Sequence, residues 1–170
     1  NAEYVVYGRT WGEYLEMLKR IKAVLGDLNL IIYVHNLSYE FQFLKGIYDF
    51  EQSDVFAINT RKIAKCYMMG CFEYRCSAIH SGSSLKKFCK DWKADHLKLS
   101  GDDFNYEKVR YPWDPLDDEE LLYCFHDVMG LCEALKNEMA HDGDTLRTIP
   151  MTITGYVRRE VKVVMRQAWH

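Results

Sequence analysis

The spacing of hydrophobic residues predicts alternating strands and helices at the start of the chain. The tyrosine and valine run over residues 4–9 predicts a strand. Apolar residues every three or four positions over 11–25 predict an amphipathic helix. The β-branched run at 29–34 predicts a buried strand, and the apolar positions from Tyr39 to Tyr48 predict a second helix.

The rest of the chain continues this pattern with three strand-like runs and then helices. The single Gly70 between the second and third runs predicts a β-hairpin. Strands and helices in this order predict an α/β domain with a mixed sheet flanked by helices. The three runs fall between Val55 and Ile79, helices are predicted after Ser84, after the acidic run 117–120 and after Pro150, and residues 95–116 are predicted to form a loop.

Composition excludes several classes of protein and leaves charge segregation as the informative feature. Of the 170 residues, 48% are hydrophobic, which excludes disorder, and the longest apolar run, Leu30–Val34, is far too short to span a bilayer. We therefore expect a cytoplasmic protein with no membrane partner. The net charge is −3, yet residues 114–144 carry ten acids against one lysine, whereas 81–98 and 147–170 each carry five basic residues. Such segments are typical of solvated faces, and they also suit a polyanion held beside a metal site.

The six cysteines form no C-x-x-C pair. Without a secretion signal they are expected to be reduced, and the positions of Cys124 and Cys132 within one helix predict buried thiols. A weaker alternative is a metal site formed by Cys76, His80, Cys89 and His96.

A first candidate motif follows the predicted strand at 29–34, where open α/β sheets place their ligands. The Asn36 amide can donate and accept hydrogen bonds, and Tyr39 and Phe43, one helical turn apart, offer faces for unpaired bases. Glu40 is a candidate cation ligand. The alternative is structural: the aromatic residues belong to the core, and Asn36 or Ser38 caps the helix.

A second candidate motif lies in the predicted longest helix. Tyr123 and Asp127 share one face, which continues with the small residues Gly130 and Ala134. A carboxylate on an apolar helix needs a partner or a metal. The opposite stripe is the predicted core face, formed by Leu121, Cys124, Val128, Leu131 and Leu135.

Together the two motifs resemble the Exo II and Exo III motifs of the proofreading 3′–5′ exonuclease domain of family B DNA polymerases, and in particular the protein-primed polymerases of phages and linear plasmids. The Y-x-x-x-D pattern of Exo III is matched by Tyr123 and Asp127. Ser84-Leu85 matches a Ser/Thr-Leu element of the family, and Gly101-Asp102 with Tyr106 matches a third. Exo II is matched by Tyr33, His35, Asn36, Leu37, Tyr39 and Glu40.

The resemblance implies a ribonuclease H-like domain over residues 1–145 and a C-terminal helix over 146–170 that leads toward a polymerase domain. It implies a phage- or mobile-element-encoded DNA polymerase of the bacterial cytoplasm, whose exonuclease removes single-stranded 3′ DNA ends with two Mg²⁺ or Mn²⁺ ions. Asp127 and Glu40 would bind metal, and Tyr123 would orient water or the scissile phosphate. The residues implied to hold DNA are His35, Asn36, Tyr39, Phe43, Ser84, Leu85 and Tyr106.

The sequence departs from the family at three places. Exo I, an Asp-x-Glu expected before Tyr4, is absent and only Glu3 stands there. Glu40 occupies a position where many relatives have Asp. Ser100 replaces the family's catalytic lysine, and Lys98 is the nearest lysine.

We therefore expect a polymerase fragment that lacks the first strands of the fold and is inactive, or nearly so, in isolation. The sheet edge left open predicts a homodimer formed by edge pairing, besides contact with the rest of the parent polymerase. The alternative is a stand-alone, non-catalytic module that binds single-stranded nucleic acid.

Overall fold

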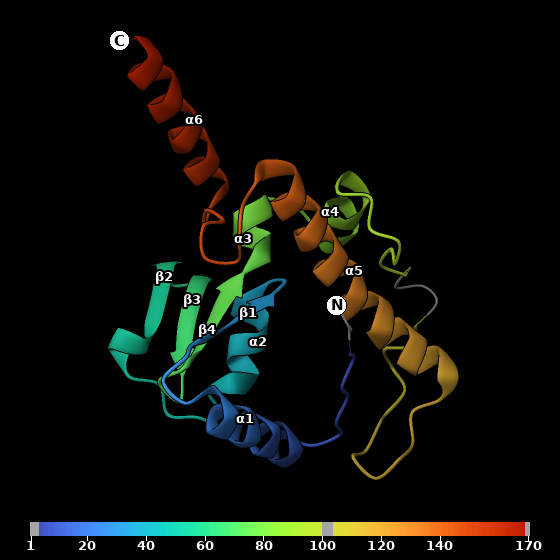
Figure 1. Ribbon diagram of the computed structural model, residues 1–170. Helices are drawn as coiled ribbons and strands as arrows, with labels where there is room; N and C mark the ends of the chain where they lie inside the picture. The colour runs from blue at the N-terminus through green and yellow to red at the C-terminus, as the bar shows by residue number, and fades with distance from the viewer. Residues whose placement is uncertain (1–3, 100–103, 169–170) are drawn as a thin grey trace. The chain divides into compact units, whose positions relative to one another are not determined.

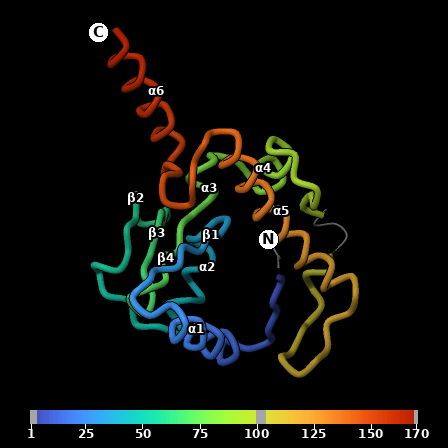
Figure 2. Tube along the Cα trace, viewed as in Figure 1, coloured from blue at the N-terminus to red at the C-terminus, as the bar shows by residue number. Residues whose placement is uncertain are grey.

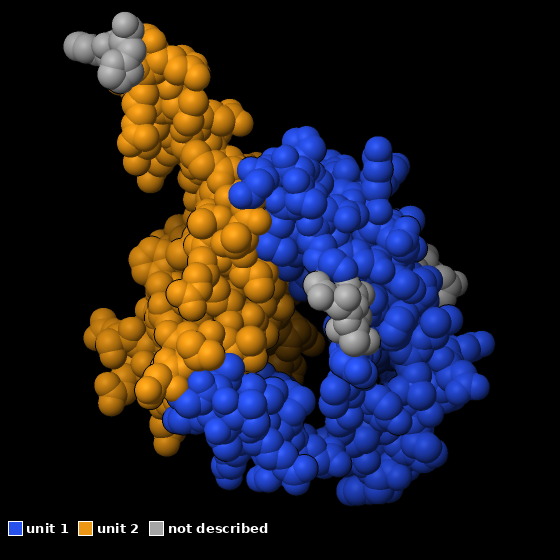
Figure 3. Space-filling model, viewed as in Figure 1, with its two compact units in different colours: residues 1–26, 85–143 blue, residues 27–84, 144–170 orange. Residues whose placement is uncertain are grey.

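The computed structural model describes residues 4–99 and 104–168, which fall into two compact units. Unit 1 combines residues 1–26 with 85–143, and unit 2 combines 27–84 with 144–170 (Figure 3). Each unit is therefore assembled from two separate stretches of the chain.

Unit 2 contains a four-stranded mixed sheet (Figure 1). Its strands are β1 (Leu30–Val34), β2 (Val55–Asn59), β3 (Lys62–Met68) and β4 (Phe72–Cys76), in the order β1-β4-β3-β2. β1 runs parallel to β4, and the other neighbours are antiparallel. The predicted α/β class with a mixed sheet is confirmed.

The predicted hairpin joins β3 to β4. Met68 pairs with Phe72, and Met69 and Gly70 between them have φ values of 54° and 75°. Glycine adopts such a conformation without strain, which explains the turn at this point of the sequence.

Helices pack on the sheet of unit 2. The helix α2 (Leu37–Leu44) contacts β3 and β4, and the short α3 (Ser77–Ser81) contacts β1. The C-terminal α6 (Ile153–Ala168) contacts α3, and a 3-10 turn, η1 (Gln52–Asp54), precedes β2. Residues on β4 alternate between buried and half-buried, as expected for a strand packed on one face. The largest core side chains of unit 2 are Tyr74, Phe72, Leu37 and Met68.

Unit 1 is helical, with α1 (Trp11–Leu25), α4 (Leu85–Asp91) and α5 (Asp118–Asp142). The trace in Figure 2 shows α4 beside α5, and the two helices are in contact. The predicted acidic start of the long helix is confirmed. Asp117 caps α5 and forms a capping box with Glu120, and Gly143 ends the helix at a φ of 68°. In the described part of the chain, no helix is long and apolar enough to cross a membrane.

Three predicted elements differ from the structure. Residues 4–9 form no strand, because no described strand pairs with them, and Tyr4, Val6 and Tyr7 are exposed. The last predicted strand ends at Cys76 and continues as α3. The second predicted helix ends at Leu44.

The predicted core face of α5 is confirmed only in part: Leu135 is buried, and Leu121 and Leu131 are half-buried. Cys124 and Val128 are exposed, and so is Cys132, so the prediction of buried thiols at 124 and 132 fails. The face that packs carries Gly130 and Ala134. Small residues are needed there, because a side chain at position 130 would collide with the His96 carbonyl oxygen and crowd the Cys89 sulfur.

Candidate functional site

The candidate site residues form two groups, one in each unit. The Asp127 cluster of unit 1 consists of Lys98, Tyr106, Tyr123 and Asp127, which are joined by a chain of contacts. The Asn36 segment of unit 2 runs from His35 to Phe43, across the end of β1 and along α2. Each group is built by its own local structure.

An ion pair lies at the centre of the Asp127 cluster. The Nζ of Lys98 donates to both Asp127 carboxylate oxygens at 2.8 Å, and about one third of each side chain is exposed. Burial acts to lower the pKa of Lys98, but the hydrogen bond and the charge of Asp127 outweigh it and raise the pKa. Lys98 therefore stays charged, and the Asp127 carboxylate is paired.

Two phenols adjoin this ion pair. The Tyr106 and Tyr123 hydroxyls are 2.6 Å apart, and the Lys98 Nζ lies 5.2 Å from the centre of the Tyr123 ring. The hydrogen bond to Tyr123 raises the pKa of Tyr106. The Phe104 ring, tilted 33° with its centre 4.4 Å away, covers Tyr123. Tyr123, Asp127 and Tyr106, which the sequence motifs single out, therefore do lie together.

Hydrogen bonds of two histidines hold the loop before Lys98 against α5. Glu133 accepts a hydrogen bond from the His96 backbone at 2.9 Å and lies 2.6 Å from its Nδ1. The His126 Nδ1 lies 2.9 Å from the Leu97 carbonyl oxygen, to which it donates. Sequence reasoning missed Glu133, because a contact between residues 37 positions apart leaves no local pattern.

A second set of ion pairs holds the loop that follows Tyr106 against the start of α5. Glu120 accepts from Lys108 at 2.7 Å and from Arg110 at 2.6 Å. The hydrogen bond from Lys108 and that from the Asp117 backbone lower the pKa of Glu120 to about 2. The guanidinium of Arg110 also lies 4.5 Å from the Phe104 ring centre. The loop that carries Tyr106 is thus tied to the first turn of α5.

The Asn36 segment begins with a left-handed residue. Asn36 has φ 67° and ψ 54°, is exposed, and its side chain makes no capping hydrogen bond. Asn36 therefore is the N-cap residue of α2, as predicted, but the predicted capping by its side chain is wrong. It is also wrong for Ser38, whose hydroxyl accepts a hydrogen bond from the Ile63 backbone at 2.9 Å. The Asn36 amide is left at the surface.

Two of the three aromatic residues of α2 are exposed, whereas Phe41 is half-buried. Tyr39 is 60% exposed and Phe43 is 41% exposed, so their assignment to the core is wrong. Their ring centres are 5.3 Å apart at 69°, an edge-to-face pair. Glu40 is half-buried, and this burial raises the pKa of its carboxyl group.

His35 has a structural contact. The Ser77 hydroxyl donates to the Val34 carbonyl oxygen at 3.2 Å and lies 3.0 Å from the His35 Nδ1, from which it accepts. This chain of hydrogen bonds fixes the end of β1 against α3, and so fixes the direction in which the chain leaves the sheet.

The remaining predicted residues are placed as follows. Ser84 is exposed at the end of unit 2, and Leu85 is the first residue of α4. Glu3, Ser100, Gly101 and Asp102 lie outside the described residues.

The described donor set does not fit the two implied metal ions. Within residues 4–99 and 104–168, no three His, Cys, Asp or Glu side chains gather in a way that would hold a metal ion. Asp127 is the single carboxylate of its cluster, and Lys98 occupies both of its oxygens. A two-ion centre would therefore need ligands besides Asp127, and the other candidate ligand, Glu40, belongs to unit 2. The cysteine–histidine alternative stays a prediction, because Cys76 and His80 belong to unit 2 and Cys89 and His96 belong to unit 1.

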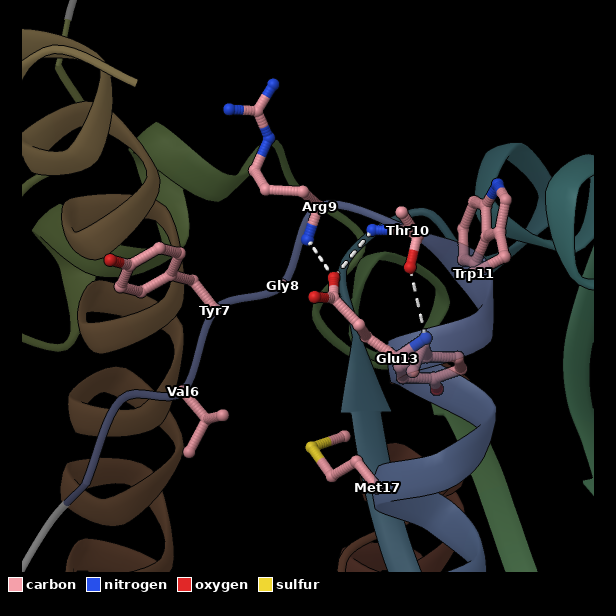
Figure 4. A pocket seen from close by; sticks show the side chains of 9 residues that line it. Val6, Tyr7, Gly8, Arg9, Thr10, Trp11, Glu13 and Met17 are labelled. Carbon is pink, nitrogen blue, oxygen red and sulfur yellow. Dashed lines mark hydrogen bonds between the residues drawn. The ribbon is translucent and has the colours of Figure 1, made fainter. Parts of the chain in front are cut away.

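A separate pocket of about 610 Å³ lies at the start of α1 (Figure 4). Glu13 stands within it, and its carboxylate accepts from the backbones of Arg9 at 2.7 Å and Thr10 at 2.9 Å. None of the predicted site residues lines this pocket, which is bounded by Val6, Tyr7, Gly8, Arg9, Thr10, Trp11, Glu13, Tyr14 and Met17.

No protein-family model, curated protein or solved structure matches this chain.

Proposed function

We propose that this chain is the exonuclease-domain segment of a family B DNA polymerase, with a ribonuclease H-like fold, and that it binds the single-stranded 3′ end of DNA. The observation that carries the proposal is the Asp127 cluster. The two residues of the Y-x-x-x-D pattern share one face of α5, and a lysine ammonium and a second phenol contact them. The mixed sheet with α2 and α3 packed on it is compatible with this fold.

The Asn36 segment is suited to contact an unpaired strand. An exposed amide can donate to a phosphate oxygen and can pair with a base edge. Exposed aromatic rings stack on bases whatever their sequence, and each such contact contributes about 1–3 kcal/mol. Asn36 and Tyr39 supply these two kinds of group at the end of a strand that runs parallel to its neighbour.

The reaction of the parent enzyme is hydrolysis of the terminal phosphodiester of a mismatched 3′ end. The Asp127 cluster holds one carboxylate, so the proposal requires further acidic ligands. We therefore expect the isolated chain to bind a single strand and not to shorten it.

The test combines a cleavage assay with a binding assay. A 5′-labelled single strand is incubated with Mn²⁺ and either this chain or Asp127→Asn, and anisotropy reports binding to the same strand. We expect no shortening, and binding that weakens at least about tenfold in Asn36→Gly/Tyr39→Ala. Asn36→Gly keeps the left-handed backbone and removes only the amide.

A matched control replaces an exposed aromatic residue elsewhere on unit 2. Phe56→Ala, on β2, leaves the Asn36 segment intact and is expected to bind as the original chain does. An unchanged affinity in Asn36→Gly/Tyr39→Ala would contradict the proposal. Stepwise shortening that Asp127→Asn abolishes would show that this chain carries its own metal ligands.

One observation favours a second candidate, a binding module without catalysis. Lys98 occupies both oxygens of Asp127, which leaves the carboxylate in the role of a structural ion-pair partner. In that case Asp127→Asn leaves binding unchanged, and a longer chain that includes the preceding residues of its reading frame also fails to cut. Cutting by the longer chain would select the polymerase fragment instead.

A further inference from the structure

The helix α6 carries its basic residues on one exposed side. Arg158, Lys162 and Arg166 follow one another at intervals of four residues, so they lie along one side of the helix. All three are exposed, and among the described residues none of them has an ion-pair partner. We call these three residues the α6 stripe.

The stripe borders a hollow of about 380 Å³ on the surface of α6. Gly155 lies at one end of the hollow and packs against Pro150, since an added methyl group there would lie 2.7 Å from the Pro150 Cβ. The hollow is lined by Gly155, Arg158, Arg159, Lys162, Val163 and Arg166.

Local contacts anchor the first turns of α6 and leave the stripe exposed. Arg159 donates to both oxygens of Asp144 at 2.7 Å, and the Tyr156 hydroxyl lies 3.4 Å from the His80 Nε2. The charge of Arg159 is therefore already balanced, and the helix is fixed near the start of the stripe by Tyr156 and Arg159. A positively charged surface held in place in this way needs little reorganisation to bind an anion.

The like charges of the stripe repel one another. Basic residues four positions apart destabilise an isolated helix by a few tenths of a kcal/mol per pair, and a bound polyanion removes this cost. The three charges span about 12 Å of helix axis, a length over which one strand of a duplex presents about three or four phosphates.

We propose that the α6 stripe binds the sugar–phosphate backbone of nucleic acid, as a contact separate from the Asn36 segment. The exposed stripe is observed in the structure, whereas the choice of nucleic acid as its ligand rests on the proposed function. The contact depends on charge and not on base sequence, because guanidinium and ammonium groups bind the phosphates.

An anionic lipid surface is the competing ligand, since α6 also exposes Val157, Val161 and Val164. Helices that lie in a membrane interface place basic residues over the polar face that surrounds the apolar one. On α6 the stripe borders the apolar face on one side, and the acid Glu160 lies near the opposite border. This asymmetry favours a backbone that runs along one side of the helix.

The test measures how salt weakens binding. Labelled oligothymidylate and its duplex with oligoadenylate are titrated by anisotropy with the full chain and with the triple variant Arg158→Ala, Lys162→Ala, Arg166→Ala. Alanine keeps the helical propensity of α6, and far-UV circular dichroism checks the fold. On the single strand we expect the slope of log affinity against log salt to fall by about 2, and affinity at about 50 mM salt to fall at least tenfold.

A matched control removes the same charge from another helix. The variant Lys19→Ala, Arg20→Ala, Lys22→Ala changes three basic residues of α1 that are exposed and do not form a single stripe. It is expected to keep most of the salt slope. An equal loss in both variants means a general charge effect and overturns the proposal, as does an unchanged slope in the stripe variant.

Two further arms separate the remaining outcomes. Vesicles of phosphatidylserine and phosphatidylcholine that bind the original chain and not the stripe variant, with oligonucleotide binding unchanged, would overturn the proposal in favour of lipid. In the variant Asn36→Gly/Tyr39→Ala we expect the α6 stripe to contribute its part of the slope of log affinity against log salt as before. If that variant binds normally and the stripe variant does not, the function proposed for the Asn36 segment fails and the stripe stands. The reverse result overturns the stripe alone.

Discussion

The Lys98 ammonium lies 2.8 Å from each Asp127 oxygen, although the two residues are 29 positions apart in the chain. The pair is partly shielded from water, so it should contribute more than a fully exposed one. In a double-mutant cycle with Lys98→Met and Asp127→Asn, measured by urea denaturation, we expect a coupling energy of about 1 kcal/mol.

An exposed pair provides the control for that cycle. Lys87 and Asp91 are 2.6 Å apart on α4 and belong to one helix, so their coupling energy should be about 0.3–0.5 kcal/mol. A coupling at Asp127 no larger than this would show that the ion pair is not held in place as the structure indicates.

Gly130 is predicted to resist substitution. In an open helix Gly→Ala stabilises by up to about 1 kcal/mol, because alanine restricts the unfolded chain. A methyl group at position 130 instead meets the His96 carbonyl oxygen and comes within 3.1 Å of the Cys89 sulfur. We expect Gly130→Ala to lower the free energy of unfolding by about 1–3 kcal/mol. Gly12, where an added methyl group would lie 3.8 Å from the nearest atom, serves as the comparison and should tolerate alanine.

Acid should weaken the anchoring of the loop that carries Tyr106. The pKa of Glu120 is about 2 in the folded protein, against an ordinary value of 4.5. A lowered pKa stabilises the fold above the ordinary value, and this contribution is lost as the pH falls from about 4.5 to about 2. Urea denaturation midpoints measured over this range should fall less steeply in Glu120→Gln. Parallel curves for the two proteins would rule out this role.

Asn36 should tolerate glycine better than alanine. A left-handed conformation costs an ordinary residue about 1–2 kcal/mol, and glycine avoids that cost. We therefore expect Asn36→Ala to be less stable than Asn36→Gly by about 1 kcal/mol in thermal or urea denaturation. Equal stabilities would place the residue in an ordinary helical conformation.

The cysteines should divide into two classes by reactivity. All six are free, and Cys66, Cys71, Cys76 and Cys89 are buried, whereas Cys124 and Cys132 are exposed. Burial also raises the pKa of Cys66 to about 12, which suppresses its thiolate. A colorimetric disulfide reagent should label two thiols quickly in the native protein and six in urea. Partial burial also raises the pKa of Cys124, so its thiol should be the slower of the two. Fast labelling spread over all six would contradict the structure.

Local sequence signals predicted most of the elements correctly. The acids at 117–120 and Gly143 mark the two ends of α5 because capping depends on residues within one turn. Gly70 marks the hairpin for the same reason. The strand expected at residues 4–9 failed because a strand requires a partner, and a run of tyrosine and valine carries no information about one.

The candidate site was predictable only in part. The spacing of Tyr123 and Asp127 places them on one face of any helix, and the structure has them so. The contacts of Asp127 with Lys98 and of Glu133 with His96 depend on how the loop folds back, which no local pattern encodes. Hydrophobicity also misled at Val128, because the close approach of α4 buries the face of α5 that carries Gly130 and Ala134 and leaves Val128 exposed.

The division of the chain into two interrupted units has a consequence for biosynthesis. The chain passes from one unit to the other at residues 26–27, 84–85 and 143–144, so neither unit is contiguous. During translation, α1 leaves the ribosome long before α4 and α5, with which it shares a unit, and the sheet leaves before α6. Folding must then wait for late segments, and the mean sequence separation of native contacts rises, which slows folding. A nascent chain halted between α5 and α6 would hold a unit 2 still lacking its closing segment, and such an intermediate is a natural substrate for chaperones.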